Sequence, residues 1–230
     1  MFKVQSQRKI FDRRVVQASL SECVKLKTYS LDSSDKKIND VSALEIFKSA
    51  LKSGQKEIEN RIKQRASGQV IVSSSTFLID QLIRTLFDYV TDHLFPLPNP
   101  TKAERLTLVS LGGYGRGEMA PHSDVDLMFL YPWKFTSHME QVIESVLYML
   151  WDMGLKIGHS TRSADDVVRL AKRDLTIRTS VLDSRWLWGD QELFIDLQKR
   201  FKAEVVEGTG ANFVEAKLKE RDERHDRMGD

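Results

Sequence analysis

Two aspartates separated by a single residue, Asp124 and Asp126, stand at the start of an apolar segment, residues 125–131. On a strand, residues two apart point to the same face, so both carboxylates would converge on one spot. Such a pair repels itself unless a cation lies between, and its hard oxygens suit Mg²⁺, which usually takes one or two carboxylates plus substrate phosphates. Two ions of this kind can stabilise the attacking and leaving oxygens of an in-line displacement. The pair therefore predicts metal-dependent phosphate chemistry, the alternative being a solvated strand end capped by Ser123.

Four of the twelve glycines fall within residues 112–117, ahead of this pair. Glycine lets backbone amides approach a phosphate closely. The spacing is GxGxG and no Gly-Lys-Ser/Thr follows, so neither a Rossmann nor a Walker phosphate loop is indicated. Taken alone, the cluster is equally typical of a tight turn between packed elements.

The first hundred residues are predicted to form an N-terminal helical region, 1–100, with a partly disordered start. Apolar residues at helical spacing predict one helix over 44–65. A second is expected after an N-cap in the cluster Ser73–Thr76, with apolar residues four apart up to Val90. Residues 20–43 show no usable period and are expected to be a loop or poorly ordered. Three of the five prolines lie within 95–100 and mark a boundary.

Beyond this boundary the pattern changes to short apolar strands alternating with helices. Strands are expected at 106–111, 125–131 and 155–160, and helices at 137–153, from 163, over 190–205 and from about 212. This order predicts an α/β (α+β) fold with a small mixed sheet. The catalytic core is placed at 101–165 and a helical appendage at 166–230, which looks truncated at its C-terminal end.

The segment from Leu111 to Leu130, LGGYGRGEMAPHSDVDLMFL, resembles the active-site motif of the DNA polymerase β-like nucleotidyltransferase superfamily. Within that superfamily it is most similar to the bifunctional uridylyltransferases/uridylyl-removing enzymes of the PII signalling protein. Segments 158–162, 173–176 and 182–190 also resemble that branch. The similarity covers residues 105–230 well and the first hundred loosely. It implies the polymerase β-like fold, with N-terminal helices and a C-terminal helical appendage.

The resemblance also implies roles for individual residues. Asp124 and Asp126 would bind two Mg²⁺ ions, for which Mn²⁺ is a possible substitute. The implied nucleotide contacts are Gly112 and Gly113 on the triphosphate, and Arg116 and Ser123 on phosphates.

The third carboxylate that the superfamily carries on the next strand has no counterpart here. Residues 155–160 hold Gly158 and His159 instead. His159 is a candidate base or metal ligand, with a purely structural histidine as the alternative. Arg162 is a further candidate phosphate contact. Asp183 is a weaker candidate acid, more typical of an ion pair at a helix end.

The implied activity is transfer of UMP from UTP to a tyrosine hydroxyl of PII, with release of pyrophosphate. Two alternatives stay open: an adenylyltransferase of the same superfamily acting on another protein or a small molecule, and a non-catalytic nucleotide-sensing module. Uridylyl removal is expected only in sequence beyond residue 230.

Composition limits the setting of this chemistry. The chain has 230 residues, 41% hydrophobic and 30% charged, as in a folded soluble domain. Its longest apolar run, residues 127–133, is far shorter than the roughly 20 residues of a membrane span, so no membrane partner is expected. A single cysteine, Cys23, favours a cytoplasmic setting. Residues 101–230 carry 19 Lys and Arg against 22 Asp and Glu, so no nucleic-acid partner is expected.

Overall fold

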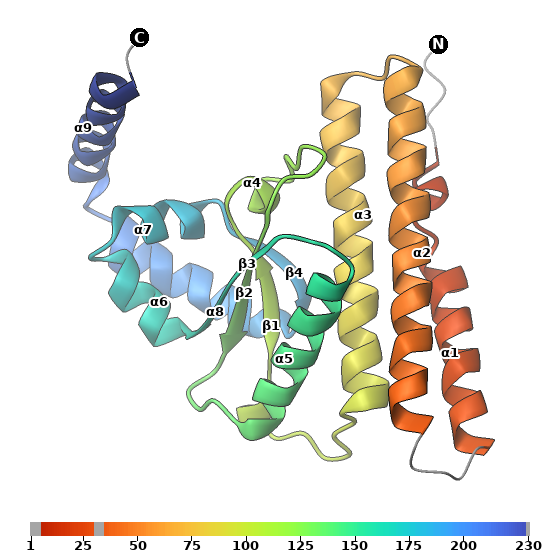
Figure 1. The fold of residues 1–230 in the computed structure, drawn as a ribbon. Coiled ribbons are helices and arrows are strands. Elements are labelled where there is room, and N and C mark those ends of the chain that lie inside the picture. Colours follow the sequence, from red (N-terminus) through yellow and green to blue (C-terminus); the bar gives the residue numbers. More distant parts are fainter. Residues whose placement is uncertain (1–5, 30–34, 229–230) are drawn as a thin grey trace.

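The computed structural model describes residues 6–29 and 35–228. A four-stranded sheet stands between long N-terminal helices on one side and shorter C-terminal helices on the other (Figure 1). The strands are β1 (Thr107–Ser110), β2 (Val125–Tyr131), β3 (Ile157–Ser163) and β4 (Arg185–Gly189). The helices are α1 (Arg13–Tyr29), α2 (Asp35–Lys63), α3 (Gly68–Tyr89), α4 (Gly112–Gly115), α5 (Ser137–Asp152), α6 (Ala164–Ala171), α7 (Leu175–Leu182), α8 (Gln191–Phe201) and α9 (Gly210–Met228). Short 3-10 or π-helical segments occupy Gln7–Lys9, Val90–Leu94, Lys102–Glu104 and Lys202–Val206.

The sheet is mixed, which confirms the predicted fold class. Its spatial order is β3-β2-β1-β4, with β2 parallel to β3 and the other two pairs antiparallel. A parallel pair needs a crossover connection, which α5 supplies between β2 and β3. The parallel register sets Asp126 opposite Gly158 and Leu127 opposite His159. β3 begins and ends slightly later than the predicted strand 155–160.

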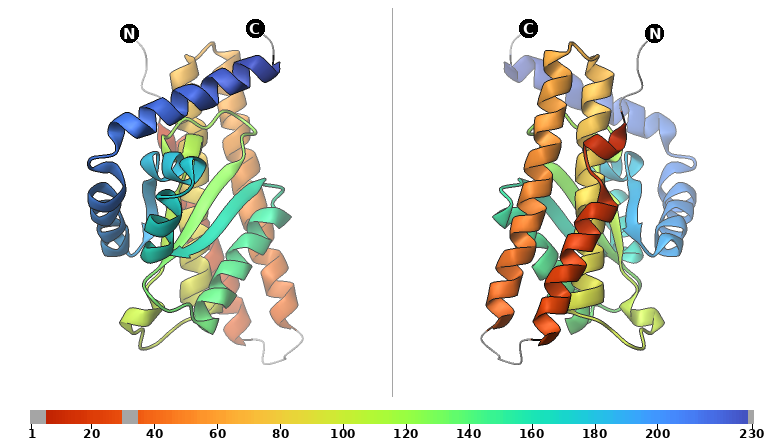
Figure 2. Two further views of the ribbon diagram at one scale, coloured as in Figure 1. Left: turned by 90° about the vertical axis from the view of Figure 1, so that its left-hand side faces the viewer. Right: turned by 90° about the vertical axis from the view of Figure 1, so that its right-hand side faces the viewer.

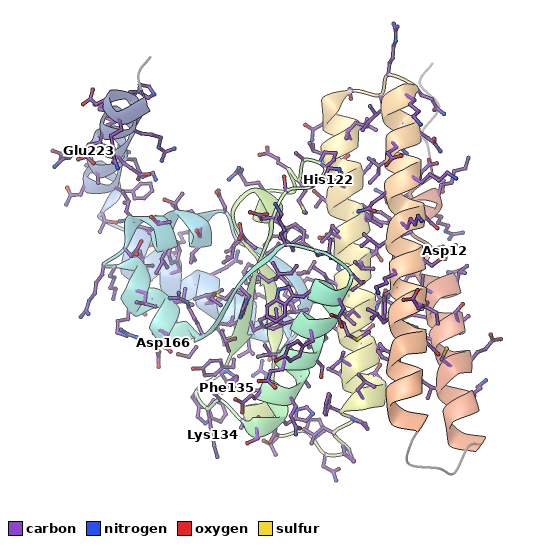
Figure 3. The ribbon with its side chains drawn as sticks, in the orientation of Figure 1. Asp12, His122, Lys134, Phe135, Asp166 and Glu223 are labelled. Atoms are coloured by element: carbon purple, nitrogen blue, oxygen red, sulfur yellow. The ribbon has the colours of Figure 1, made fainter. Side chains whose placement is uncertain are left out.

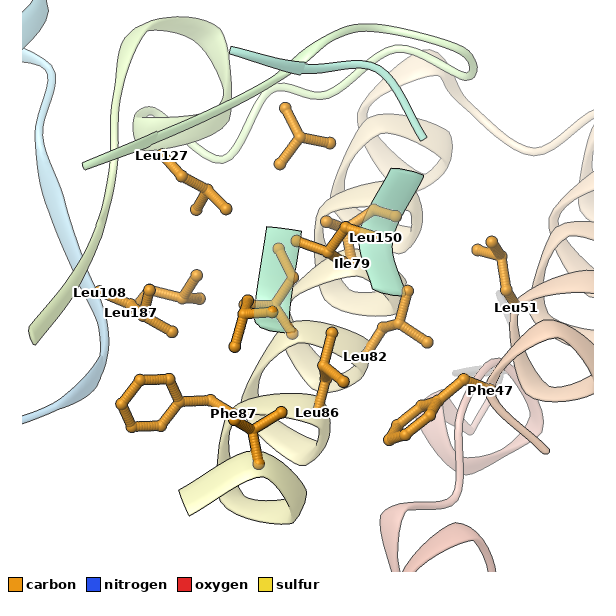
Figure 4. Packing of buried hydrophobic residues seen from close by; sticks show 14 of the residues in the cluster. Phe47, Leu51, Ile79, Leu82, Leu86, Phe87, Leu108, Leu127, Leu150 and Leu187 are labelled. Carbon is orange, nitrogen blue, oxygen red and sulfur yellow. The ribbon is translucent and has the colours of Figure 1, made fainter. Parts of the chain in front are cut away.

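Two hydrophobic clusters cover the two faces of the sheet. On one face, α3 and α5 pack against side chains of β1, β2 and β4, and the cluster continues into α2 and α1 (Figure 4). The labelled members run from Phe47 and Leu51 on α2, through Leu82 and Leu86 on α3, to Leu187 on β4. On the other face, α6 and α8 cover the side chains of β1 and β2 that point away from α5. Because the first cluster contains residues of α1, α2, α3 and the strands, the helical region and the sheet share one core. Burying each large aliphatic side chain in it contributes roughly 1.5–3 kcal/mol.

The expectation of a loop at 20–43 was wrong. α1 covers residues up to Tyr29 and α2 begins at Asp35, leaving only residues 30–34 of that segment outside the described part. In α1, Val16 and Leu20 lie four residues apart and are buried in the core. Two such residues define a helical face, but too few apolar residues follow them to show a clear period in the sequence. The first five residues of the predicted disordered start lie outside the described residues.

α3 begins earlier than its serine cluster predicts. Ser67 caps the helix, accepting a hydrogen bond from the Val70 amide, and Ser73–Thr76 lie inside it. The hydroxyls of Ser74, Ser75 and Thr76 donate to carbonyls four residues back instead of capping. Together with the π-helical turn after it, α3 is long and apolar enough to cross a membrane by length and composition, but 61% of its most apolar window is buried inside the fold.

The fourth strand was not predicted from the sequence. β4 lies within 166–230, where only helices were expected, and pairs with β1 at the edge of the sheet. Trp186 and Trp188 alternate around buried Leu187 because they lie on a strand. The boundaries at 100 and 165 stay predictions. The last helix, α9, projects away from the sheet layers and contacts α7 (Figures 1 and 2).

Gly54, in α2, lies where α3 and the backbone at Ile10 approach this helix closely. A Cβ atom there would overlap the side chain of Leu78 on α3 and lie 2.7 Å from the carbonyl oxygen of Ile10. We expect Gly54→Ala to lower the free energy of unfolding by about 1–3 kcal/mol, although alanine favours helices, because the backbone at Ile10 must move. Gly68→Ala is the control, since nothing lies within 4 Å of its added atom. Equal unfolding midpoints in urea for the two variants would contradict this packing.

Candidate active site

The two aspartates lie at the start of β2. Asp124 directly precedes the strand and Asp126 is its second residue, and both are exposed. The intervening Val125 and the following Leu127 are each 1% exposed and belong to the core on the α5 side. Strand alternation therefore directs Asp126 to the opposite face, the one that carries α6 and α8.

Two glycines leave the space that the Asp126 carboxylate occupies. A Cβ atom on Gly158, its partner in β3, would lie 2.5 Å from Oδ1 of Asp126. A Cβ atom on Gly112 would lie 3.3 Å from Oδ2. Gly112 also has a φ of +55°, a conformation that other residues adopt at a cost. The carboxylate is thus confined between β3 and the start of α4.

The glycine cluster forms a single helical turn that links β1 to the loop before β2. The amide of Leu111, just before it, donates to the carbonyl oxygen of Asp126 at 3.0 Å. At its other end, a Cβ atom on Gly115 would overlap the carbonyl oxygen of Asp183, so this glycine permits close backbone packing. Gly112 and Gly113 lie in the first turn, where amides have no acceptor within the helix.

The electrostatics of the pair would favour a bound cation. Desolvation, and then the charge of Asp124, raise the pKa of Asp126 because both disfavour its ionised form. No group of three or more His, Cys, Asp or Glu side chains suited to a metal occurs in residues 6–29 and 35–228. The donor set of two carboxylates nevertheless fits Mg²⁺, whose other ligands would be nucleotide phosphates and water.

Residues 52–164 match the family described as "Putative nucleotidyltransferase DUF294". The chain carries a nucleotidyltransferase domain. This match contains both aspartates, the glycine turn and the first three strands. It places these residues in a family whose description is that of a nucleotidyltransferase.

Curated relatives extend the similarity beyond the nucleotidyltransferase domain. The chain is 45% identical over 229 residues to the bifunctional uridylyltransferase/uridylyl-removing enzyme of Rhodospirillum rubrum, covering 99% of this chain and 24% of that protein. The enzyme of the same name from Erythrobacter litoralis is 46% identical over 228 residues, with the same coverage. That of Azospirillum brasilense is 52% identical over 184 residues, covering 80% of this chain and 20% of the relative. The chain therefore spans about a quarter of the length of these relatives or less.

The structure does not bring His159 to the aspartates. Its register partner is Leu127, so it lies on the opposite face of the sheet from Asp126. There its ring packs edge-on against Trp151 of α5, with ring centres 5.8 Å apart. On the Asp126 face, β3 of the nucleotidyltransferase domain offers Gly158 and Ser160. The candidate role of His159 as base or metal ligand at this pair does not fit this placement.

Arg116 lies beside the glycine turn, but carboxylates already engage it. Its guanidinium donates to Glu118 at 2.9 Å and to Asp183 at 2.6 Å, and its Nη2 would be 3.7 Å from a Cβ atom on Gly113. To bind the Arg116 guanidinium, a phosphate would have to displace the carboxylate of Glu118 or of Asp183. Asp183 does form an ion pair at a helix end, as expected, and its partner is Arg116.

Ser123 and Arg162 are the other two candidate phosphate contacts. Ser123 lines a cavity of about 290 Å³ between α2, α3 and the turn before β3, and His122 of the same loop lies beside α3 (Figure 3). Arg162 pairs with Leu130 in the register, four residues along β3 from Gly158. At about 3.3 Å per residue, it is roughly 13 Å along the strand from the Asp126 level. Both remain candidate phosphate contacts without a structural link to the turn.

Two residues that were not predicted, Asp80 on α3 and Arg185 on β4, support the glycine turn. Asp80 is an acidic residue on α3 whose neighbours Ile79 and Leu82 are buried. A buried carboxylate needs a charged partner. An isolated acid in an apolar stripe was therefore the available signal.

The space beside Gly158 can be tested by double substitution. We expect Gly158→Ala to lower the free energy of unfolding by about 1–3 kcal/mol, because its methyl group would displace the Asp126 carboxylate. In an Asp126→Ala background the same change should cost much less, since the carboxylate is gone. Chemical unfolding of the four proteins gives the coupling. Purely additive effects would show that Asp126 does not occupy this space.

The raised pKa of Asp126 predicts a pH-dependent gain in stability on removing its charge. Its folded-state pKa lies above the unfolded value of about 4, so ionised Asp126 destabilises the metal-free fold above that folded pKa. This penalty disappears as the pH falls below the unfolded value. Asp126→Asn should therefore melt slightly higher than wild type in EDTA at about pH 7, with a gain below about 1 kcal/mol that vanishes near pH 3.5.

Asp190→Asn is the control of opposite sign for this measurement. The guanidinium of Arg105 lowers the pKa of Asp190, so its ionised form stabilises the fold at neutral pH. This variant should melt lower than wild type at about pH 7, by an amount that shrinks on acidification. A lower melting temperature for Asp126→Asn than for wild type at neutral pH would contradict the destabilising effect assigned to the ionised Asp126 carboxylate.

Proposed function

We propose that this nucleotidyltransferase domain transfers UMP from UTP to a tyrosine hydroxyl of the PII signalling protein. The observation that carries the proposal is the carboxylate pair at the start of β2, confined by Gly112 and Gly158. The nucleotide is inferred from relatives that are named uridylyltransferases and are 45–52% identical. The acceptor is inferred from the resemblance of the segment 111–130 to that branch.

In the proposed reaction, the tyrosine oxygen forms a bond to the α-phosphorus of UTP. The bond from that phosphorus to the bridging oxygen breaks, pyrophosphate leaves, and the hydroxyl proton is released to solvent. Asp124 and Asp126 would hold two Mg²⁺ ions. When bound, such ions neutralise phosphate charge and stabilise the attacking and leaving oxygens.

The protein's own contribution is positioning and charge. The α4 turn would orient the triphosphate through the amides of Gly112 and Gly113. Arg116 would contribute positive charge beside this turn, exchanging a carboxylate partner for a phosphate oxygen. The confined Asp126 would keep its carboxylate fixed, so little rearrangement is needed on nucleotide binding.

Transfer can be measured with each α-labelled nucleoside triphosphate, Mg²⁺ and purified PII. We expect label from UTP on PII, and a loss on the order of 10²–10³-fold in Asp124→Asn or Asp126→Asn, because each removes a charge that binds metal. Asp165→Asn is the control, since Asp165 is an exposed aspartate on α6 paired with Arg200. It should retain wild-type activity.

The other outcomes separate the alternatives. Label from ATP in place of UTP would indicate an adenylyltransferase. Nucleotide binding without transfer to any acceptor would indicate a sensing module. Near-wild-type transfer by a folded Asp124→Asn/Asp126→Asn double variant would contradict the carboxylate mechanism.

A further inference from the structure

Arg185, the first residue of β4, holds the end of the α4 turn. Its Nε donates to the carbonyl oxygen of Gly115 at 3.2 Å, and its Nη2 donates to that of Tyr114 at 3.3 Å. In return, the carbonyl oxygen of Arg185 accepts a hydrogen bond from Ser110 of β1 at 3.1 Å. The strand before the turn and the turn itself are therefore tied to one residue of β4.

Asp80 of α3 fixes the orientation of this guanidinium. Its carboxylate accepts from Nη1 at 2.8 Å and from Nη2 at 3.0 Å, a bidentate pair. The side chain of Asp80 is 12% exposed and that of Arg185 is 31% exposed. Bidentate arginine–carboxylate pairs set orientation as well as energy, and lysine cannot reproduce their geometry.

The ring of Tyr114 closes the other side of Arg185. Tyr114 is 2% exposed, and its ring centre lies 5.5 Å from Cζ of Arg185. Burial, and then the neighbouring charge of Asp80, raise the pKa of the Tyr114 hydroxyl. Arg185 is thus occupied by Asp80, by two carbonyl oxygens and by this ring. It has structural partners on each nitrogen, and so it would act on a nucleotide only through the turn.

α3 is itself fixed against β4, which places Asp80 accurately. The indole Nε1 of Trp188 donates a hydrogen bond to Asp88, which lies on α3 eight residues after Asp80. The guanidinium of Arg84 also faces the ring of Trp188, with Cζ 5.5 Å from its centre. Asp80 therefore belongs to a helix anchored to the same strand that carries Arg185.

We propose that Arg185 and Asp80 are positioning residues for the nucleotide site. They hold the C-terminal end of α4, so that Gly112, three residues before Gly115, stays beside Asp126 without displacing its carboxylate. The inference rests on the proposed function, in which this turn receives the triphosphate. A shift of a few tenths of an ångström at Gly112 would disturb the turn and the metal-binding carboxylate together.

Steady-state kinetics of Arg185→Lys and Asp80→Asn test this role. We expect each to raise KM for UTP at least tenfold and to leave KM for the PII acceptor within twofold, because only the nucleotide contacts the turn. The double variant should lose little more than the worse single variant, since both act through one contact. Hydrogen exchange in a peptide covering residues 111–118 should become faster in both.

Arg105→Lys is the matched control. Arg105 and Asp190 form a second bidentate pair on the sheet, with side chains 25% and 24% exposed, at the far end of β4 from Arg185. Arg105→Lys should leave KM for UTP within twofold of the wild-type value and should leave hydrogen exchange in residues 111–118 unchanged. A KM for UTP that stays within twofold in Arg185→Lys, or that rises equally in Arg105→Lys, would overturn the proposal. Should Arg185→Lys not fold, the isosteric Asp80→Asn decides alone by the same criteria.

Direct binding separates this proposal from the proposed function. The Kd of each nucleoside triphosphate with Mg²⁺ is measured for wild type and the variants. If wild type binds a triphosphate other than UTP, the proposed function fails, and a tenfold weaker Kd for that triphosphate in Arg185→Lys still supports the positioning role. If wild type binds none, the positioning proposal is overturned as well.

Discussion

The carboxylate of Asp126 occupies a space that exists only because Gly112 and Gly158 have no side chains. Any larger residue at Gly158 would come within 2.5 Å of the Asp126 Oδ1. The same confinement desolvates the carboxylate beside Asp124 and raises its pKa, a penalty on the ionised form that a bound cation would offset. Steric confinement and charge repulsion therefore come from one arrangement. Together they explain why ionised Asp126 is expected to lower the free energy of unfolding when no metal is bound.

Each strand of the sheet contributes one part of this arrangement. β2 carries Asp126, the parallel neighbour β3 sets Gly158 against it, and β1 leads into the turn that begins with Gly112. The edge strand β4 supplies Arg185, which α3 orients through Asp80. The N-terminal helices thus contribute to the site as well as to the core, in keeping with a family match that begins at residue 52, within α2.

Local patterns were sufficient to predict the α/β fold class and strand β2, because alternation and glycine content act over a few residues. They were insufficient where distant contacts decide. His159 directly follows Gly158, yet strand register turns it to the Trp151 side. β4 is short and rich in tryptophan, and it becomes a strand only by pairing with β1. The Asp80–Arg185 pair joins residues 105 positions apart, beyond the reach of any local pattern.

Mn²⁺ binding followed by electron paramagnetic resonance, in the presence of a non-hydrolysable UTP analogue, tests the carboxylate site most directly. Mn²⁺ takes the same oxygen ligands as Mg²⁺ and is visible to this method. We expect wild-type protein to bind Mn²⁺ together with the analogue, and Asp126→Asn to bind it at least tenfold more weakly while melting no lower than wild type. Unchanged Mn²⁺ affinity in a folded Asp126→Asn variant would contradict the assignment of this carboxylate to the metal.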